Sequence, residues 1–103
     1  MEFGQECYCL GQHMNKIKNS LNSLLNKVTR DSWTRGDQSL KIFIDDCKTL
    51  LIHLVEKDLY INVNICKMNK DALYKVAKEV CDLENDYVNV YRDYVDYLKA
   101  IVV

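Results

Sequence analysis

Three residues near the N-terminus carry side chains that could bind a metal. Cys7, Cys9 and His13 form the pattern C-x-C-x3-H, and on a helix Cys9 and His13 would lie one turn apart on the same side. A structural zinc site needs four ligands. The chain has no C-x-x-C pair, so other cysteines and His53 would have to converge by folding. We therefore regard the three residues as weak metal candidates, and we predict no bound metal and no other cofactor.

The same region could also contain a thiol nucleophile. A catalytic cysteine needs a neighbouring histidine and a third group that orients the histidine, and Cys9 with His13 meets only the first requirement. The sequence contains no glycine-rich phosphate loop and no nucleophile elbow, and a narrow helical bundle offers little concave surface for a substrate. Cys7, Cys47 and Cys81 occupy apolar repeat positions that suit small core residues. We therefore expect no catalytic residues and a protein that is not an enzyme.

The charge of the chain is nearly balanced. Fourteen Lys and Arg residues stand against 15 Asp and Glu residues, which gives a formal net charge of −1, so no global field attracts nucleic acid or anionic lipid. Basic side chains of the first helix, such as Lys16 and Lys18, would point about 200° apart. They indicate a solvated surface. A small nucleic-acid-binding or zinc-stabilised regulatory protein is the alternative class, and nucleic acid is the less favoured partner.

Cysteine usage and hydropathy bear on the compartment. Five cysteines, an odd number, occur without a signal-peptide pattern, which favours reduced thiols over a disulfide framework. No apolar run is long enough for a membrane span. We expect a cytoplasmic protein, and a nuclear location is also compatible. The chain lacks proline and is rich in Asn, Lys, Ile and Tyr, a composition associated with AT-rich coding sequences such as those of large DNA viruses.

Apolar spacing predicts a long first helix, over about 5–31. The seam alternates steps of four and three residues, as in a coiled coil. Gly4 and Gly11 each weaken a helix by about 1 kcal/mol relative to alanine, so the firm part is expected to begin near Gln12. The seam consists of Phe3, Cys7, Leu10, Met14, Ile17, Leu21, Leu24 and Val28.

A turn is predicted over 29–36, and Asp37 is placed to cap the next helix. The second helix is expected over about 38–59. Its seam is formed by Leu40, Ile44, Cys47, Leu51 and Leu54, and it is widened by Ile42, Phe43, Leu50, Ile52 and Val55.

Residues 60–68 form a predicted connector with two interpretations. Ile61 and Val63 alternate with Asn62 and Asn64, which is the period of a half-buried strand and allows a short extended segment at 60–67. Alternatively the second helix continues, because Leu54, Ile61, Ile65 and Met68 are also spaced as on a helix. The residues alone leave both interpretations open.

The third helix is predicted over about 70–102 and carries the most extended apolar pattern. Asn69 is a suitable N-cap. Two adjacent apolar seams make the helix apolar over much of its circumference, which is more than one partner surface can cover. At 1.5 Å per residue the helix is about 50 Å long, against roughly 40 Å and 30–35 Å for the others. Its end, from Tyr87 to Val103, is therefore expected to extend beyond them.

These elements predict an all-α fold in one domain spanning 1–103: a three-helix antiparallel bundle or an elongated coiled coil. The expected function is non-enzymatic protein–protein interaction, as an adaptor, assembly subunit or inhibitor, with another protein chain, a homo-oligomer or a larger complex as partner. Tyrosine rings offer a large contact area with a hydroxyl at the edge. The alternative is that they cover the protein's own core. The candidate interface comprises Tyr87, Val88, Tyr91, Tyr94, Val95, Tyr97, Leu98 and Ile101.

Overall fold

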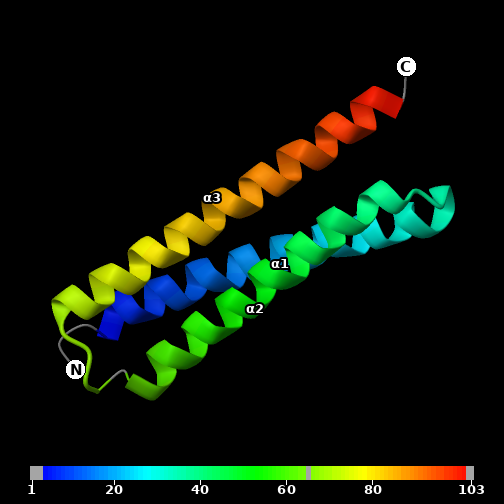
Figure 1. Ribbon diagram of the computed structural model, residues 1–103. Coiled ribbons are helices and arrows are strands. Elements are labelled where there is room, and N and C mark those ends of the chain that lie inside the picture. The colour runs from blue at the N-terminus through cyan, green and yellow to red at the C-terminus, as the bar shows by residue number, and fades with distance from the viewer. Residues whose placement is uncertain (1–3, 65, 102–103) are drawn as a thin grey trace.

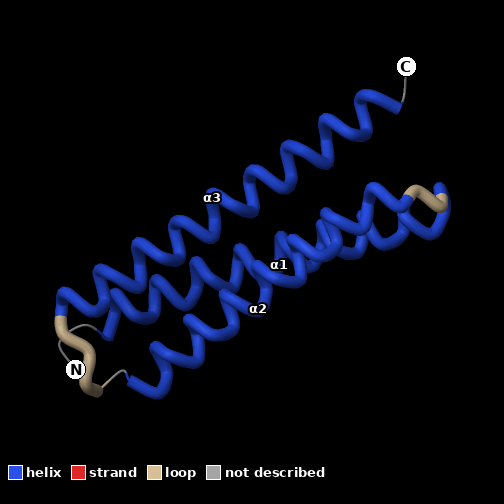
Figure 2. The backbone as a smooth tube through the Cα atoms, viewed as in Figure 1, coloured by secondary structure: helices blue, strands red, loops and turns tan. Residues whose placement is uncertain are grey.

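The apolar seams assemble into three long helices in the computed structural model, which describes residues 4–64 and 66–101. They are α1 (Gly4–Arg35), α2 (Lys41–Asn64) and α3 (Lys70–Ile101), with a short 3₁₀ helix, η1 (Gln38–Leu40), before α2. Consecutive helices run in opposite directions along an elongated molecule with extents of 54 × 19 × 16 Å (Figure 1). The described residues contain helices and loops but no strand (Figure 2). The all-α bundle prediction is confirmed.

From Cys7 to Val28 the seam of α1 faces the interior as expected, but the predicted end of this helix at 31 is wrong. The described helix begins at Gly4, close to the predicted start at about 5 and without a break before Gln12, and it continues through the predicted turn to Arg35. No glycine or proline interrupts the chain between Gly11 and Gly36, so nothing in the backbone chemistry stops the helix earlier. Gly36 has φ of 65°, the left-handed conformation that glycine adopts most readily and that ends many helices.

The turn after α1 is organised by Asp37. Its Oδ1 accepts hydrogen bonds from the backbone N–H of Ser39 at 2.9 Å and from the Ser39 hydroxyl at 2.7 Å. The predicted capping role of Asp37 is confirmed, although the element that it caps is η1. Leu40 follows with no exposed surface, so the cap fixes the point at which the chain re-enters the core.

Helix α2 continues to Asn64, five residues beyond the predicted end at 59. Tyr60–Asn64 are therefore helical, and the extended alternative is wrong for them; Ile65 lies outside the described residues. Burial explains the result, because Leu54 and Ile61 are two turns apart and are 0 % and 4 % exposed. Val63, by contrast, is exposed, as a helical period requires. Core contact thus selects the helical spacing.

The predicted widening of the α2 seam is wrong in part. Phe43 packs against the core, and Leu50 is buried within it. Ile42, Ile52 and Val55 are instead 61 %, 59 % and 54 % exposed. The reason is geometric: a three-helix bundle covers only one side of each helix, and these three side chains lie on the outside.

Helix α3 begins as predicted, with Asn69 Oδ1 accepting the N–H of Ala72 at 2.8 Å. It is not longer than its neighbour, because α1 and α3 each contain 32 residues. The expected overhang from Tyr87 is therefore wrong: Tyr94 and Tyr97 contact residues near the end of α1 and at the start of η1. The extra length of α1 lies beside this part of α3 and buries Tyr94, whereas Val88, Tyr91 and Ile101 stay exposed.

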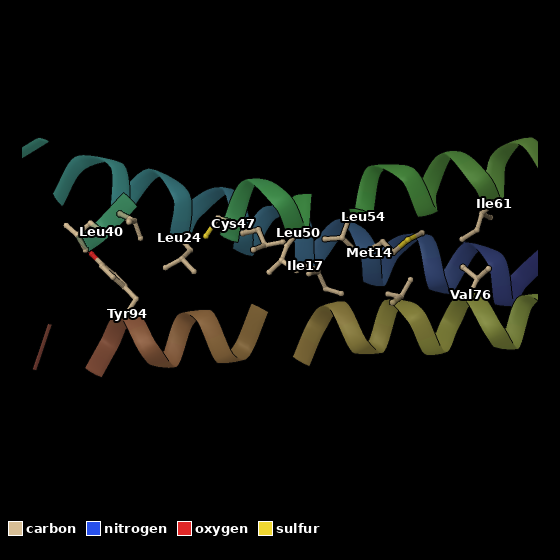
Figure 3. Packing of buried hydrophobic residues seen from close by; sticks show 13 residues of the cluster. Met14, Ile17, Leu24, Leu40, Cys47, Leu50, Leu54, Ile61, Val76 and Tyr94 are labelled. Carbon is tan, nitrogen blue, oxygen red and sulfur yellow. The ribbon is translucent and has the colours of Figure 1, made fainter. Parts of the chain in front are cut away.

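One core runs the length of the bundle, and all three helices contribute to it (Figure 3). Side chains that have no exposed surface lie at intervals along it, which is how an elongated bundle keeps its helices in register. The buried cluster comprises Met14, Ile17, Leu21, Leu24, Val28, Leu40, Cys47, Leu50, Leu54, Ile61, Val76, Val80 and Tyr94.

Candidate functional site

A groove runs between α1 and α3. It consists of two adjoining hollows of about 260 and 240 Å³ that share Lys27 and Tyr91, so they form one continuous depression. We call it the α1–α3 groove. Its lining comprises Asn19, Ser20, Ser23, Leu24, Lys27, Arg30, Asp31, Tyr87, Tyr91, Tyr94, Val95 and Leu98.

The α3 wall of the groove is apolar and aromatic. Tyr87 and Tyr91 are one turn apart, and their ring centroids are 6.2 Å apart in a tilted arrangement. Tyr91 is 45 % exposed. Val88, which is 50 % exposed, lies on the same side of the helix as Tyr91 and Val95 because these residues are three and seven positions apart. This wall therefore presents apolar surface that the bundle does not cover.

The α1 wall is polar apart from Leu24, and at one end it carries Lys27 and Arg30 beside the Asp31 carboxylate that accepts from Tyr94. Its side chains follow helical steps of three and four from Asn19 to Arg30, and two of them, Ser20 and Ser23, are small. Among the described residues no carboxylate forms an ion pair with Lys27 or Arg30. The groove thus joins an apolar side to a side with two available cations.

Two tyrosine–aspartate hydrogen bonds fasten the last turns of α3 to the rest of the bundle. The Tyr94 hydroxyl donates to Asp31 Oδ2 in α1, and the Tyr97 hydroxyl donates to Asp37 Oδ2 at 2.5 Å. The ring of Phe43 meets both tyrosine rings edge-on, at centroid distances of 5.9 and 6.1 Å. These contacts hold the groove's walls at a fixed separation at this end.

These hydrogen bonds shift the pKa of three of the residues, Tyr94, Tyr97 and Asp37. Burial, followed by the bond to Asp31, raises the pKa of Tyr94 well above its ordinary value. The bond to Tyr97 lowers the pKa of Asp37, and the Ser39 bonds lower it further. The same bond to Asp37 raises the pKa of Tyr97. For the Tyr97–Asp37 pair, the two shifts describe a neutral phenol that donates to an ionised carboxylate.

Replacing Tyr97 by phenylalanine is expected to flatten the acid side of the stability curve. Because the folded-state pKa of Asp37 lies below its ordinary value of 3.8, the ionised carboxylate stabilises the fold above about pH 4, and this contribution is lost as pH falls through the lowered pKa. Tyr97→Phe removes the largest cause of that shift. Urea unfolding at neutral pH and at pH near 2 measures the difference. An equal gap between wild type and variant at both pH values would contradict the assignment.

The structure separates the three metal candidates. Cys7 is buried in the core, Cys9 is exposed, and His13 Nε2 lies 3.1 Å from Glu84 Oε2 on α3. Residues 4–64 and 66–101 contain no group of three or more His, Cys, Asp or Glu side chains that could hold a metal ion. The contact of Glu84 with His13 links α3 to α1.

The predicted interface residues fall into three environments. Val88, Tyr91 and Ile101 are exposed by 39 % or more, and Tyr94 is only 4 % exposed and belongs to the core. The others are partly buried: Tyr87, Val95, Tyr97 and Leu98. Five of the eight residues line the α1–α3 groove: Tyr87, Tyr91, Tyr94, Val95 and Leu98.

Sequence reasoning missed the α1 wall of the groove. Ser20, Ser23, Lys27 and Arg30 share one side of α1 at helical spacing, and this signal was visible beside the apolar seam. What the spacing could not show is that α3, rather than solvent alone, borders that side. The pairing of the two walls is a property of the packing.

Comparisons with known proteins found no relative of this chain. No family model, curated protein or solved structure matches the chain. Within the part of the chain that the structure describes, no helix combines the length and apolar character needed to cross a membrane. Function must therefore be inferred from the groove and the helix faces themselves.

Proposed function

We propose that the protein is a non-enzymatic interaction module that binds an amphipathic helix of another protein in the α1–α3 groove. The observation that carries the proposal is the α3 wall of the groove, where Tyr91 is 45 % exposed and faces a largely polar α1 wall across a continuous depression. Val88, which is 50 % exposed, extends this apolar surface beyond the groove lining. Apolar surface that borders a groove of this kind is the usual site for an added helix.

The dimensions of the groove suit about three turns of helix. Its α1 wall extends from Asn19 to Asp31, which spans roughly 18 Å at 1.5 Å per residue. A helix laid along two neighbouring helices packs its side chains between theirs at interaxial distances of about 8–10 Å. Such a ligand would complete a local four-helix arrangement and cover Tyr91.

The charges of the groove specify the chemistry of the ligand helix. Its apolar stripe would lie on Val88, Tyr91 and Val95, and the edge facing α1 would carry carboxylates opposite Lys27 and Arg30. Complementary charge at a rim chiefly sets association rate and selects between partners. The tyrosine hydroxyls at the edge can remain in contact with water. We therefore propose an acidic amphipathic helix as the ligand.

The exposed thiols suggest where such a module would work. Cys9, Cys66 and Cys81 are free and exposed, and the two remaining cysteines are free and buried. Unpaired accessible thiols persist in reducing compartments. This supports a cytoplasmic location as part of the proposal.

Two synthetic peptides test the proposal directly. Both are helical and share one apolar stripe; one carries glutamates along the edge and the other carries lysines. We expect the glutamate peptide to bind more tightly, and Tyr91→Asp to weaken it by at least tenfold, because the substitution places a charge in the centre of the contact. Tyr74→Asp is the matched control, since Tyr74 is on the same helix and is 75 % exposed outside the groove lining.

A charge-reversal variant tests whether Lys27 and Arg30 select an acidic ligand. Lys27→Glu combined with Arg30→Glu is expected to reverse the preference, so that the lysine peptide binds more tightly. Isothermal titration at two salt concentrations supplies the affinities. Equal binding of both peptides to wild type, or equal effects of Tyr91→Asp and Tyr74→Asp, would contradict the proposed site.

A further inference from the structure

Helix α2 carries a second apolar face that the bundle leaves uncovered. Ile52, Val55, Leu59 and Val63 are 59 %, 54 %, 62 % and 70 % exposed. They follow steps of three, four and four residues, which places them on one side of the helix. We call these four residues the outer α2 stripe.

The outer α2 stripe lies opposite the face that α2 buries. Ile61, which is 4 % exposed, and Val63 are two positions apart, so their side chains point about 200° apart around the helix. Leu54, on the buried side, has no exposed surface. A helix of a three-helix bundle needs one apolar face, and α2 has two.

The exposed apolar area is close to the apolar part of a standard dimer interface. The four side chains together expose on the order of 400 Å², which is within the range of the largest apolar patch on a typical monomer. A standard interface buries about 800 Å² per partner, of which somewhat more than half is apolar. The stripe, together with the neighbouring Tyr60, which is 46 % exposed, supplies that apolar part.

We propose that the outer α2 stripe binds the same stripe of a second copy in an antiparallel, two-fold symmetric pair. Such a contact is isologous, so one patch serves as both halves of the interface. In the antiparallel arrangement Ile52 lies across from Val63 of the second copy, and Leu59 lies near the centre. Apolar surface then meets apolar surface along the whole stripe.

Charges on the same face of α2 select the antiparallel direction. Lys41, Asp45 and Lys48 continue the stripe toward the N-terminal end of the helix in steps of four and three, and all three are exposed. In a parallel pair, each of these charged residues would face the same residue of the second copy. Like charges in contact oppose association. In the antiparallel pair they lie beyond the apolar overlap. Glu56, at the edge of the stripe, has its carboxylate 4.0 Å from His53 Nδ1 of the same helix.

The proposed dimer leaves the α1–α3 groove free. In a three-helix bundle the surface between two helices lies on the side away from the third, so a pair formed through α2 would carry two outward grooves. A bivalent molecule gains avidity for ligands that present two helices. Dimerisation through the stripe does not require groove binding, so either proposal can fail while the other holds.

The mass of the pure protein in solution tests the dimer. Light scattering at tens of micromolar protein is expected to give twice the 12.1 kDa of the chain. Leu59→Asp is expected to give monomer with an unchanged helical circular dichroism spectrum. Ile42→Asp is the matched control, because Ile42 is on the same helix, is 61 % exposed against 62 % for Leu59, and lies off the stripe; this variant is expected to remain a dimer.

A pair of charged variants tests the direction. Ile52→Lys and Val63→Glu are each expected to be monomeric alone and to form a mixed dimer when combined, since only the antiparallel pair brings the lysine opposite the glutamate. If Leu59→Asp fails to fold, association of this mixture still tests whether the outer α2 stripe forms the interface. A monomeric wild type, a dimer that survives Leu59→Asp, or equal loss in Ile42→Asp would overturn the proposed interface. Failure of the mixture to associate would overturn the antiparallel arrangement.

Discussion

Leu54→Ala is expected to lower the free energy of unfolding by about 3 kcal/mol, the usual cost of removing three buried carbons and leaving a cavity. Leu54 has no exposed surface and belongs to the buried cluster that joins the helices (Figure 3). An elongated bundle has a narrow core, so few neighbouring side chains can move to fill the space. Urea unfolding followed by circular dichroism measures the loss as a shift of the midpoint.

Ile42→Ala is the control for this prediction. It shortens a side chain on the same helix that is 61 % exposed, and surface substitutions of this kind change stability by about 0.5 kcal/mol or less. The two variants together establish which side of α2 faces inward. Equal losses, or a larger loss in Ile42→Ala, would contradict the orientation of the helix.

Tyr94→Phe is expected to lower the free energy of unfolding by about 2 kcal/mol, within the range for hydrogen bonds to charged groups. The substitution keeps the ring, which is 4 % exposed, and removes only the hydroxyl that donates to Asp31 Oδ2. The carboxylate of Asp31 then loses its partner on α3 in a partly buried position. Tyr91→Phe is the matched control: Tyr91 is 45 % exposed, and the described residues provide its hydroxyl with no hydrogen-bond partner.

The Tyr94 bond also has a signature at alkaline pH. Because the folded-state pKa of Tyr94 lies above its ordinary value of 10.0, the unfolded chain loses the phenolic proton first. The contribution is therefore present below about pH 10 and is lost as pH rises toward the folded-state pKa. Wild type should lose stability over this range more steeply than Tyr94→Phe. Parallel curves for the two proteins would contradict the role of the hydroxyl.

The sequence predicted the core of α1 and the starts of the following elements well. The unbroken heptad spacing identified Met14, Leu21 and Val28, all of which have no exposed surface. Asp37 and Asn69 were predicted as caps, and each accepts the expected backbone N–H. These features depend on local spacing or on one side chain and its nearest amides, so a single sequence contains the information.

Other features depend on contacts between distant residues and could not be predicted locally. The polar run 29–36 was predicted to be a turn, yet it is helical as far as Arg35, and Asp31 within it is bonded to Tyr94, 63 residues away. The inward side of α2 was also ambiguous, because both sides of that helix are apolar. Periodicity shows that two faces exist; only packing decides which one is buried.

Only the α3 wall of the candidate site could be predicted from the sequence, because the groove depends on how two distant helices pack. Its α3 wall follows from the unusual density of tyrosine and valine, which marked Tyr87, Tyr91 and Val95. Its α1 wall contains common polar residues, and only the position of α3 beside Lys27 and Arg30 makes them part of a groove. Tyr94 was assigned to the candidate interface, and its burial shows that part of the tyrosine surface serves the core.

Titration of ¹⁵N-labelled protein with the glutamate-edged peptide tests the central claim, that the α1–α3 groove binds an amphipathic helix. Amide chemical shifts report each residue separately, so the measurement locates the contact as well as detecting it. We predict saturable shifts concentrated in 19–30 of α1 and 87–98 of α3, with the outer α2 stripe unaffected. Shifts that gather on α2, or no saturable shifts at all, would contradict the claim.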